Sequence, residues 1–248
     1  FFFSFFFFFF FFFFFFFLQV HDAMIEAGAA LGGHSGWKLG FKNVLPGLPA
    51  GYAPLFGVGQ VGNTATANMR KHNVYCVEAE LGFVLRRSLA PGRQYTADEV
   101  WDAVGEAVLC IELVGRRHTG LQLQPLQLYA DAMCAGGYVE GPRFAVHHPE
   151  CELLRAHAEG DLSATLTLDG APAAAGTGAD CPLDSPLGSL VFLANSLTAR
   201  GRELAANRVI ISGAICKTLA IQPGQLVRAT FAASGGAHVL GATEVRLA

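Results

Sequence analysis

Residues 77 to 85, VEAELGFVL, alternate between apolar and other residues as an extended strand requires. Successive side chains of a strand point to opposite faces, so the apolar positions share one face: Val77, Ala79, Leu81, Phe83 and Leu85. Glu78 and Glu80 share the other face, about 7 Å apart, which allows both to reach one cation. An ordinary amphipathic strand with its glutamates in water is the alternative.

Strand patterns outnumber helical ones along the chain. Strands are expected at 36–41 and 107–115, in a hairpin that turns at Asp169 and Gly170, and throughout the segment after residue 208. We therefore expect an α+β fold dominated by a curved, β-rich mixed sheet with few flanking helices.

Four segments of the sequence have helical character, and a fifth, separate segment is expected to be a loop. The helices are expected within 20–31, 97–107, 126–137 and 187–201. Thr96 and Glu99 have the spacing of a capping box at the start of the second helix. A segment rich in glycine and proline, 43–63, is expected to be a long loop.

The first 17 residues of this 248-residue chain are phenylalanine at every position except Ser4. Such a tract is of low complexity, and we expect an extension derived from a repeat or a gene model that lies outside the fold. A membrane anchor is the alternative, because roughly 18 apolar residues can cross a bilayer, although no basic residue precedes the tract. Residues 18–248 are then expected to form a single domain of a cytoplasmic protein.

Charge and motifs argue against several function classes. A net charge of −3 provides no basic surface for nucleic acid. The six cysteines form no C-x-x-C pair, which favours buried thiols in a reducing compartment over a zinc or redox site. GVGQVG, residues 57–62, matches a dinucleotide fingerprint, but Pro54 precedes it and no packing helix is expected after it. No G-x-S-x-G elbow occurs, and the histidines lack metal-ligand spacing.

Glu112 is difficult to explain as a solvated charge, because it lies within the apolar run AVLCIELVG, residues 107–115. A buried carboxylate without a partner is costly or takes up a proton, whereas coordination to a divalent cation removes the penalty. Carboxylates on neighbouring strands, completed by water, suit Mg²⁺ or Mn²⁺. The sequence thus predicts a metal site at Glu78, Glu80 and Glu112, with solvated glutamates as the alternative.

These residues resemble a known metal-binding pattern. VEAELGFVL, followed by CIELV about thirty residues later, resembles the 2-keto-4-pentenoate hydratase and 4-oxalocrotonate decarboxylase family of the fumarylacetoacetate hydrolase superfamily. Further stretches agree in order across residues 19–240: GWKLGF, LQLYADAMCAGGYVEG, PLGSLVFLANSLTARGREL, RVIISGAI and IQPGQLVRATF.

The resemblance implies a β-roll of the fumarylacetoacetate hydrolase C-terminal type and a homo-oligomeric lyase. Its Mg²⁺ or Mn²⁺, held by the three glutamates, would bind a 2-oxo acid while water adds to a conjugated double bond, as in 2-hydroxypenta-2,4-dienoate. Lys38 would transfer a proton or polarise the substrate, with a surface lysine as the alternative. Ser212 and Gly213, in RVIISGAI, would contact the substrate.

The chain also departs from the family pattern. Leu55 stands where the family has an acidic residue, and Gly115 begins GRR where the family has Asp-Ser-Arg. The family's Ala-Asp-Asn is Ala-Asp-Ala here, at 130–132. Two further interpretations therefore stay open: a decarboxylase of a related 2-oxo-dicarboxylate, and a catalytically silent homologue that only binds ligand.

Overall fold

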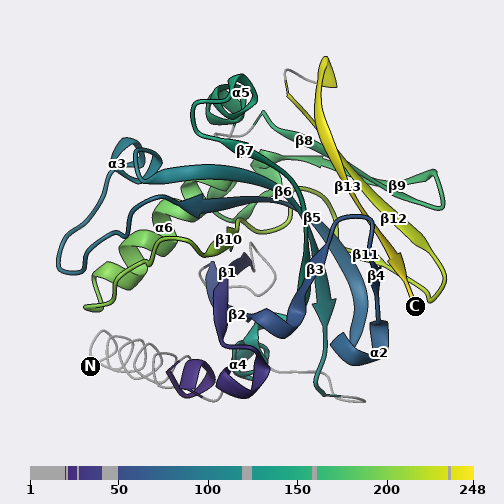
Figure 1. Ribbon diagram of the computed structural model, residues 1–248, viewed down its shortest axis with the longest axis horizontal. Helices are drawn as coiled ribbons and strands as arrows, with labels where there is room; N and C mark the ends of the chain where they lie inside the picture. The colour runs from purple at the N-terminus through teal and green to yellow at the C-terminus, as the bar shows by residue number, and fades with distance from the viewer. Residues whose placement is uncertain are drawn as a thin grey trace, which may run out of the picture.

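Two β-sheets and a few short helices make up the described part of the chain (Figure 1). The computed structural model describes residues 20, 22–26, 28–40, 50–118, 125–157, 161–233 and 236–248. The larger sheet has the strand order β2 (Gly51–Phe56), β1 (His34–Gly40), β10 (Val209–Ile211), β5 (Val74–Leu85), β6 (Val104–Gly115), β7 (Ala135–Ala145) and β3 (Gln60–Gly62), and β11 (Leu219–Ala220) also pairs with β5.

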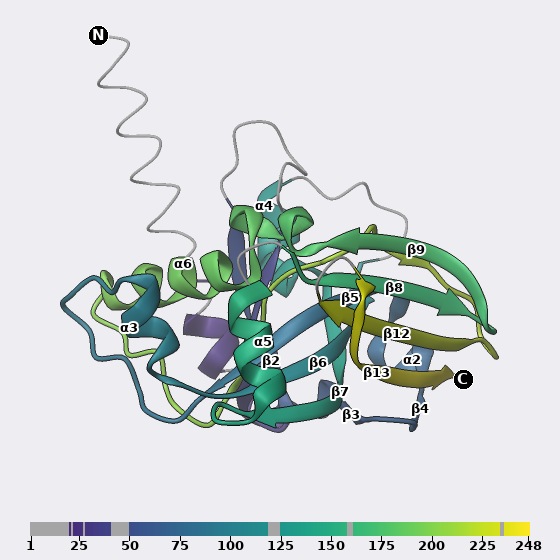
Figure 2. The same cartoon turned by 90° about the horizontal axis from the view of Figure 1, so that it is seen from above.

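The smaller sheet packs against β6 and β7 of the larger sheet (Figure 2). The smaller sheet has the order β4 (Thr66–Ala67), β13 (His238–Leu247), β12 (Leu226–Ala233), β8 (Ser163–Leu168) and β9 (Ala171–Thr177). The α-helices are α2 (Met69–His72), α3 (Ala97–Trp101), α4 (Pro125–Ala130), α5 (Pro149–His157) and α6 (Pro186–Thr198). The 3₁₀ turns that lie wholly within the described segments are η1 (Gly28–Leu31), η2 (Gly57–Gly59), η3 (Ala132–Cys134), η4 (Gly178–Asp180) and η5 (Pro182–Asp184).

The larger sheet curls into a half-barrel, because its two edge strands are consecutive in the chain. The turn η2 joins β2 at one edge to β3 at the other, and β3 pairs in parallel with β7. Where η2 crosses β7 the backbones approach closely: a Cβ on Gly59 would lie 2.8 Å from Gly137 Cα, so only glycine fits. The half-barrel therefore has an inner face and an outer face.

Both faces of β5 and β6 are buried. The glutamates of β5 therefore do not form a water-exposed face, as they would in an ordinary amphipathic strand. On the outer face, Leu81, Phe83 and Ile111 pack in a core that includes Val227 and Phe231 of the smaller sheet. The inner face contains a separate apolar cluster: Leu55, Val108, Cys110, Tyr138, Val209 and Ile211. Glu78, Glu80 and Glu112 also lie on this inner face, since they alternate with the outer residues.

Several expected features are confirmed. Thr96 Oγ1 accepts from Glu99 N at 3.3 Å while Glu99 Oε2 accepts from Thr96 N at 2.9 Å, which is the predicted capping box. The turn between β8 and β9 has positive φ at both Asp169 (50°) and Gly170 (84°), as a two-residue hairpin turn of this kind requires. The α+β prediction is confirmed as well.

Other boundaries were wrong. The expected loop at 43–63 contains β2 and β3 in its described part, from residue 50 onward. Pro54 is compatible with β2 because this is an edge strand, where a missing N–H is tolerated. The helix expected over 97–107 ends at Trp101, since the apolar strand β6 begins at Val104. The helix expected to end at Gly136 and Gly137 ends earlier, because β7 begins at Ala135.

None of the six cysteines, all within the described segments, forms a disulfide bond. Among the described residues, no helix has the length and apolar character needed to cross a membrane. The phenylalanine tract lies outside the described residues, so the expectations for residues 1–17, and for residues 18–248 as a single domain, stay predictions.

Candidate metal centre

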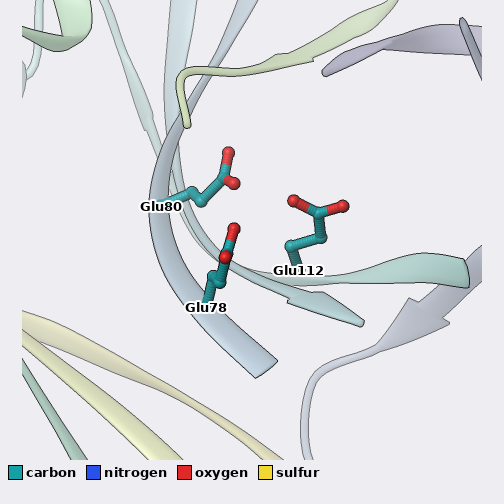
Figure 3. A group of neighbouring side chains, drawn as sticks. All are labelled: Glu78, Glu80 and Glu112. Atoms are coloured by element: carbon teal, nitrogen blue, oxygen red, sulfur yellow. The ribbon is translucent and has the colours of Figure 1, made fainter. Parts of the chain in front are cut away.

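Three glutamates from two adjacent strands converge on the inner face of the half-barrel. Glu78 of β5 lies directly opposite Glu112 of β6, and Glu80 lies two residues further along β5. Carboxylate oxygens of all three lie within 4.8 Å of one another, and their side chains project toward a common space (Figure 3). Glu80 and Glu112 are fully buried, whereas Glu78 is partly exposed.

A backbone amide and a hydroxyl each donate a hydrogen bond to one of the two glutamates of β5. Gly213 N donates to Glu80 Oε2 at 2.7 Å, and Thr218 Oγ1 donates to Glu78 Oε1. Glu80 Oε1 and Glu112 Oε2 are buried, and no described residue donates a hydrogen bond to either. An unpartnered buried polar atom costs about 1–3 kcal/mol, and more when it is charged. A divalent cation fits both atoms, because oxygen ligands are what Mg²⁺ and similar ions prefer.

Crowding of the carboxylates changes their acidity. Burial, followed by the charge of Glu112, raises the pKa of Glu78 to about 7. Burial and the charges of Glu112 and Glu78 raise the pKa of Glu80 well above its usual value. Three like charges in such a space are therefore unfavourable unless positive charge joins them.

Lys38 supplies one positive charge to this cluster. Its Nζ forms an ion pair with Glu112 Oε1 and donates to Met133 O at 3.1 Å, and the residue is only 4% exposed. Burial alone would lower the pKa of Lys38, but the neighbouring carboxylates, Glu112 foremost, raise it above its usual value. The alternative of a surface lysine is therefore wrong.

The turn that presents Met133 to Lys38 is held by an ion pair that the sequence reasoning missed. Arg117 Nε contacts Asp131 Oδ1 at 2.6 Å, and Arg117 Nη1 donates to Ala135 O at 2.8 Å. Three consecutive residues of the turn, Ala132, Met133 and Cys134, have positive φ, a backbone conformation that is costly for residues other than glycine. Arg117 and Asp131 thus fix a strained loop beside the lysine.

Gly213 and Ser212 lie behind the cluster. Gly213 has φ +96°, and a Cβ there would lie 2.4 Å from Pro182 Cδ, so glycine is needed for its amide to reach Glu80. Ser212 is fully buried, and its Oγ lies within 3.8 Å of Cys181 Sγ. The substrate contact expected for these two residues stays a prediction. Thr218 was not foreseen, since nothing in its local sequence marks it.

A cavity of about 640 Å³ opens beside the cluster. Lys38 and Glu78 line its inner part, together with the turn at Met133 and Cys134. Two cationic residues, Arg116 and Lys217, also line it. Arg116 stacks on Tyr75, with 4.3 Å between the guanidinium carbon and the ring centroid. A small organic acid fits such a space.

Comparisons with known proteins agree with this geometry. A 2-keto-4-pentenoate hydratase of Paraburkholderia xenovorans is 35% identical to the chain over 158 residues, covering 60% of the chain and 52% of the hydratase. A 4-oxalocrotonate decarboxylase of a Pseudomonas species is 28% identical over 152 residues, covering 61% and 55%. The chain is a relative of these hydratases and decarboxylases. It spans a little over half the length of each, and no family model matches it.

Two solved structures share the fold of the chain. The 4-oxalocrotonate decarboxylase of Pseudomonas putida G7, complexed with magnesium and adipate, superposes with a TM-score of 0.79 at 21% identity, covering 94% of the chain and 86% of the decarboxylase. A yeast protein of the fumarylacetoacetate hydrolase family superposes with a TM-score of 0.59 at 10% identity, covering 86% and 92%. The predicted fold class is therefore confirmed.

The structure shows where the residues that depart from the family pattern lie. Leu55 is 1% exposed within the inner apolar cluster, so an acidic side chain there would lie beside apolar neighbours such as Val108 and Ile211. Gly115 ends β6 and is followed by Arg116 at the cavity and by Arg117. Arg117, the last residue of GRR, forms the ion pair with Asp131 described above.

Proposed function

We propose that the chain is a metal-dependent lyase that adds water to an unsaturated 2-oxo or 2-hydroxydienoic acid such as 2-hydroxypenta-2,4-dienoate. One observation carries the proposal: two buried carboxylate oxygens without donors, Glu80 Oε1 and Glu112 Oε2, lie in a three-glutamate cluster beside an open cavity. The similarity to 2-keto-4-pentenoate hydratases supports the same reaction class.

Glu78, Glu80 and Glu112 would hold Mg²⁺ or Mn²⁺. Bound there, the ion would act as a Lewis acid toward the carboxylate and carbonyl oxygens of the substrate. Gly213 and Thr218 donate hydrogen bonds that orient the carboxylates of Glu80 and Glu78, so these ligand atoms are positioned before the ion binds.

Lys38 would polarise the substrate or deliver a proton at the inner end of the cavity. Its ammonium group is fixed by two acceptors, Glu112 Oε1 and Met133 O, and can donate a further hydrogen bond. The side chains of Val114 and Leu128 line the same cavity and limit water around the reacting atoms.

A metal titration of the purified chain tests the proposal. Calorimetry with Mg²⁺ and Mn²⁺ should show saturable binding to the wild type and to Glu203→Gln, an exposed control, but binding weakened at least tenfold in Glu80→Gln. Loss of the ultraviolet absorbance of 2-hydroxypenta-2,4-dienoate should follow the same order. Equal metal affinity in Glu80→Gln would refute the ligand set, while metal binding without turnover would favour the silent homologue.

Decarboxylation of a related 2-oxo-dicarboxylate is the second candidate. Arg116 and Lys217 line the same cavity as Lys38 and Glu78, and so could pair with a second carboxylate at the far end of a substrate. If a dicarboxylate is the substrate, Arg116→Gln should raise its KM about tenfold, as expected for loss of one charge-assisted contact. Unchanged kinetics with a dicarboxylate in Arg116→Gln would exclude this candidate.

We further propose a homo-oligomer located in the cytoplasm, as the family resemblance implies. Light scattering of the purified chain and fractionation of expressing cells test these two points. A monomer, or recovery with the membrane fraction, would contradict them.

A further inference from the structure

A second cavity, of about 440 Å³, lies at a different level of the half-barrel from the glutamate cluster. His34 and Ser35 line it at the start of β1, about 10–13 Å along that strand from Lys38. No residue that lines it lines the cavity beside the metal centre. The inner apolar cluster, including Val209 and Tyr138, separates the two levels.

This second cavity contains buried polar atoms that lack well-aligned partners. Among the described residues, Ser35 Oγ and His34 Nε2 are buried without a well-aligned hydrogen-bond partner, and the hydroxyl of Ser35 interacts only with that of Tyr138. Burial, followed by the charge of Arg208, lowers the pKa of His34 to about 4, so its imidazole is neutral near pH 7 and can donate one hydrogen bond. Outside the glutamate cluster, two such polar atoms on adjacent residues facing one cavity indicate space for a ligand.

Two arginines line the cavity, Arg143 and Arg208, and both nearby carboxylates pair with Arg143 rather than with Arg208. Arg143 is neutralised by Glu106 at 2.7 Å and Glu140 at 2.6 Å, and Glu140 also accepts from Gln60 at 2.9 Å. Arg208 is half-buried, donates to the backbone carbonyl of His34, and forms no ion pair with any described residue. A desolvated guanidinium without a carboxylate favours an incoming anion.

We propose that this second cavity binds a small oxyanion, the carboxylate of an organic acid or inorganic phosphate, between Arg208, Ser35 and His34. The hydroxyl of Tyr138, which lines the same cavity, provides a further donor, because burial raises its pKa to about 12 and keeps it protonated. The site is separate from the proposed lyase reaction, none of whose residues it contains.

Anion binding to the metal-free chain tests this site. Calorimetric titrations with acetate and with phosphate, in chelator and in a buffer without carboxylate, should each be fitted for the wild type, Arg208→Gln, Arg208→Lys and Ser35→Ala. We expect saturable binding of at least one anion, weakened at least tenfold in Arg208→Gln and less in Arg208→Lys, which keeps the charge. The anion that binds more tightly identifies which of the two sources the site takes.

Arg228→Gln, at an exposed arginine that lines neither cavity, is the matched control and should bind the anion as the wild type does. Thermal unfolding of each variant, with Arg208→Lys as the conservative replacement, separates lost binding from lost folding. The proposal is overturned if neither anion binds saturably, so that water alone occupies the cavity. It is also overturned if Arg228→Gln weakens binding as much as Arg208→Gln does.

Discussion

The carboxylate of Glu112 lies where its neighbours along β6 are apolar and solvent does not reach. Its ion pair with Lys38 joins residues 74 positions apart, so the two strands β1 and β6 must be placed correctly before either charge is compensated. Replacing a buried ion pair as a unit is often tolerated, whereas removing one partner leaves the other charge buried alone. The Lys38–Glu112 ion pair therefore makes the stability of the folded chain depend on the correct placement of these two site residues.

Lys38→Met should therefore lower the free energy of unfolding of the metal-free chain by about 3–5 kcal/mol. Adding Glu112→Gln to Lys38→Met should recover most of this loss, because the uncompensated charge is then gone. Urea unfolding at pH 7 measures both. Lys217→Met, an exposed lysine at the same cavity, should change stability by no more than about 0.5 kcal/mol. Equal effects of the two lysine substitutions would contradict the role of the ion pair.

His34 should make the stability of the chain depend on pH. Its pKa is about 4 in the folded chain and near 6.5 when unfolded, so protonation favours the unfolded state. The stabilisation is fully present above pH 6.5 and is lost as the pH falls toward 4, by at most about 3.5 kcal/mol at about 1.4 kcal/mol per pH unit.

In His34→Phe, which keeps a ring against Trp37, the loss of stability between pH 6.5 and 4 should be smaller than in the wild type. Urea unfolding at half-unit pH steps measures the difference, without carboxylate or phosphate buffers. Parallel pH profiles for the two proteins would show that His34 does not titrate in this range.

At the scale of elements, α3 depends on its first residue. The helix has only five residues, and its capping box satisfies two backbone donors that no internal bond reaches. Thr96→Ala should reduce the free energy of unfolding by about 1 kcal/mol, while Thr96→Ser, which keeps the acceptor oxygen, should retain most of it. Denaturant titration of the three proteins decides this, and equal loss in both variants would assign the effect to packing of the methyl group.

Local sequence patterns correctly predicted the elements whose conformation depends only on residues close together in the sequence. The capping box, the Asp169–Gly170 hairpin and the alternation of β5 need only neighbours in sequence. The strand β2 was missed because Gly51 and Pro54 indicate a loop, and only pairing with β1 makes it a strand. The early end of α3 has the same origin, since pairing of β6 with β5 and β7 competes with helix propensity.

For the whole molecule, the glutamates were predictable but most of their partners were not. A charge within an apolar strand, as at Glu112, is visible in the sequence. The Gly213 amide and the Met133 carbonyl carry no side-chain signal, and the curl of the sheet brings them to Glu80 and Lys38. Arg117 and Asp131 lie 14 residues apart in the sequence. Their ion pair could not be predicted, because it stabilises the turn η3, which is visible only in the structure.

The crowded carboxylates should make the fold depend on a divalent cation. Mg²⁺ at about 100 times its Kd should raise the free energy of unfolding by about 2.7 kcal/mol, because only the folded chain presents the site. Glu80→Gln should behave in the opposite way: without metal it should exceed the wild type by about 1 kcal/mol or more, since one of three repelling groups is neutral, as is common when functional strain is relieved. With Mg²⁺ it should gain little.

Thermal unfolding with and without Mg²⁺, at pH 7 and fixed ionic strength, measures both effects, and Glu203→Gln controls for general loss of negative charge. The two shifts must reverse the order of stability: Glu80→Gln above the wild type in chelator, and at or below it in excess Mg²⁺. A cation effect of the same size in both proteins would mean that Mg²⁺ acts elsewhere, because a site that has lost one of three carboxylate ligands cannot bind the ion equally well.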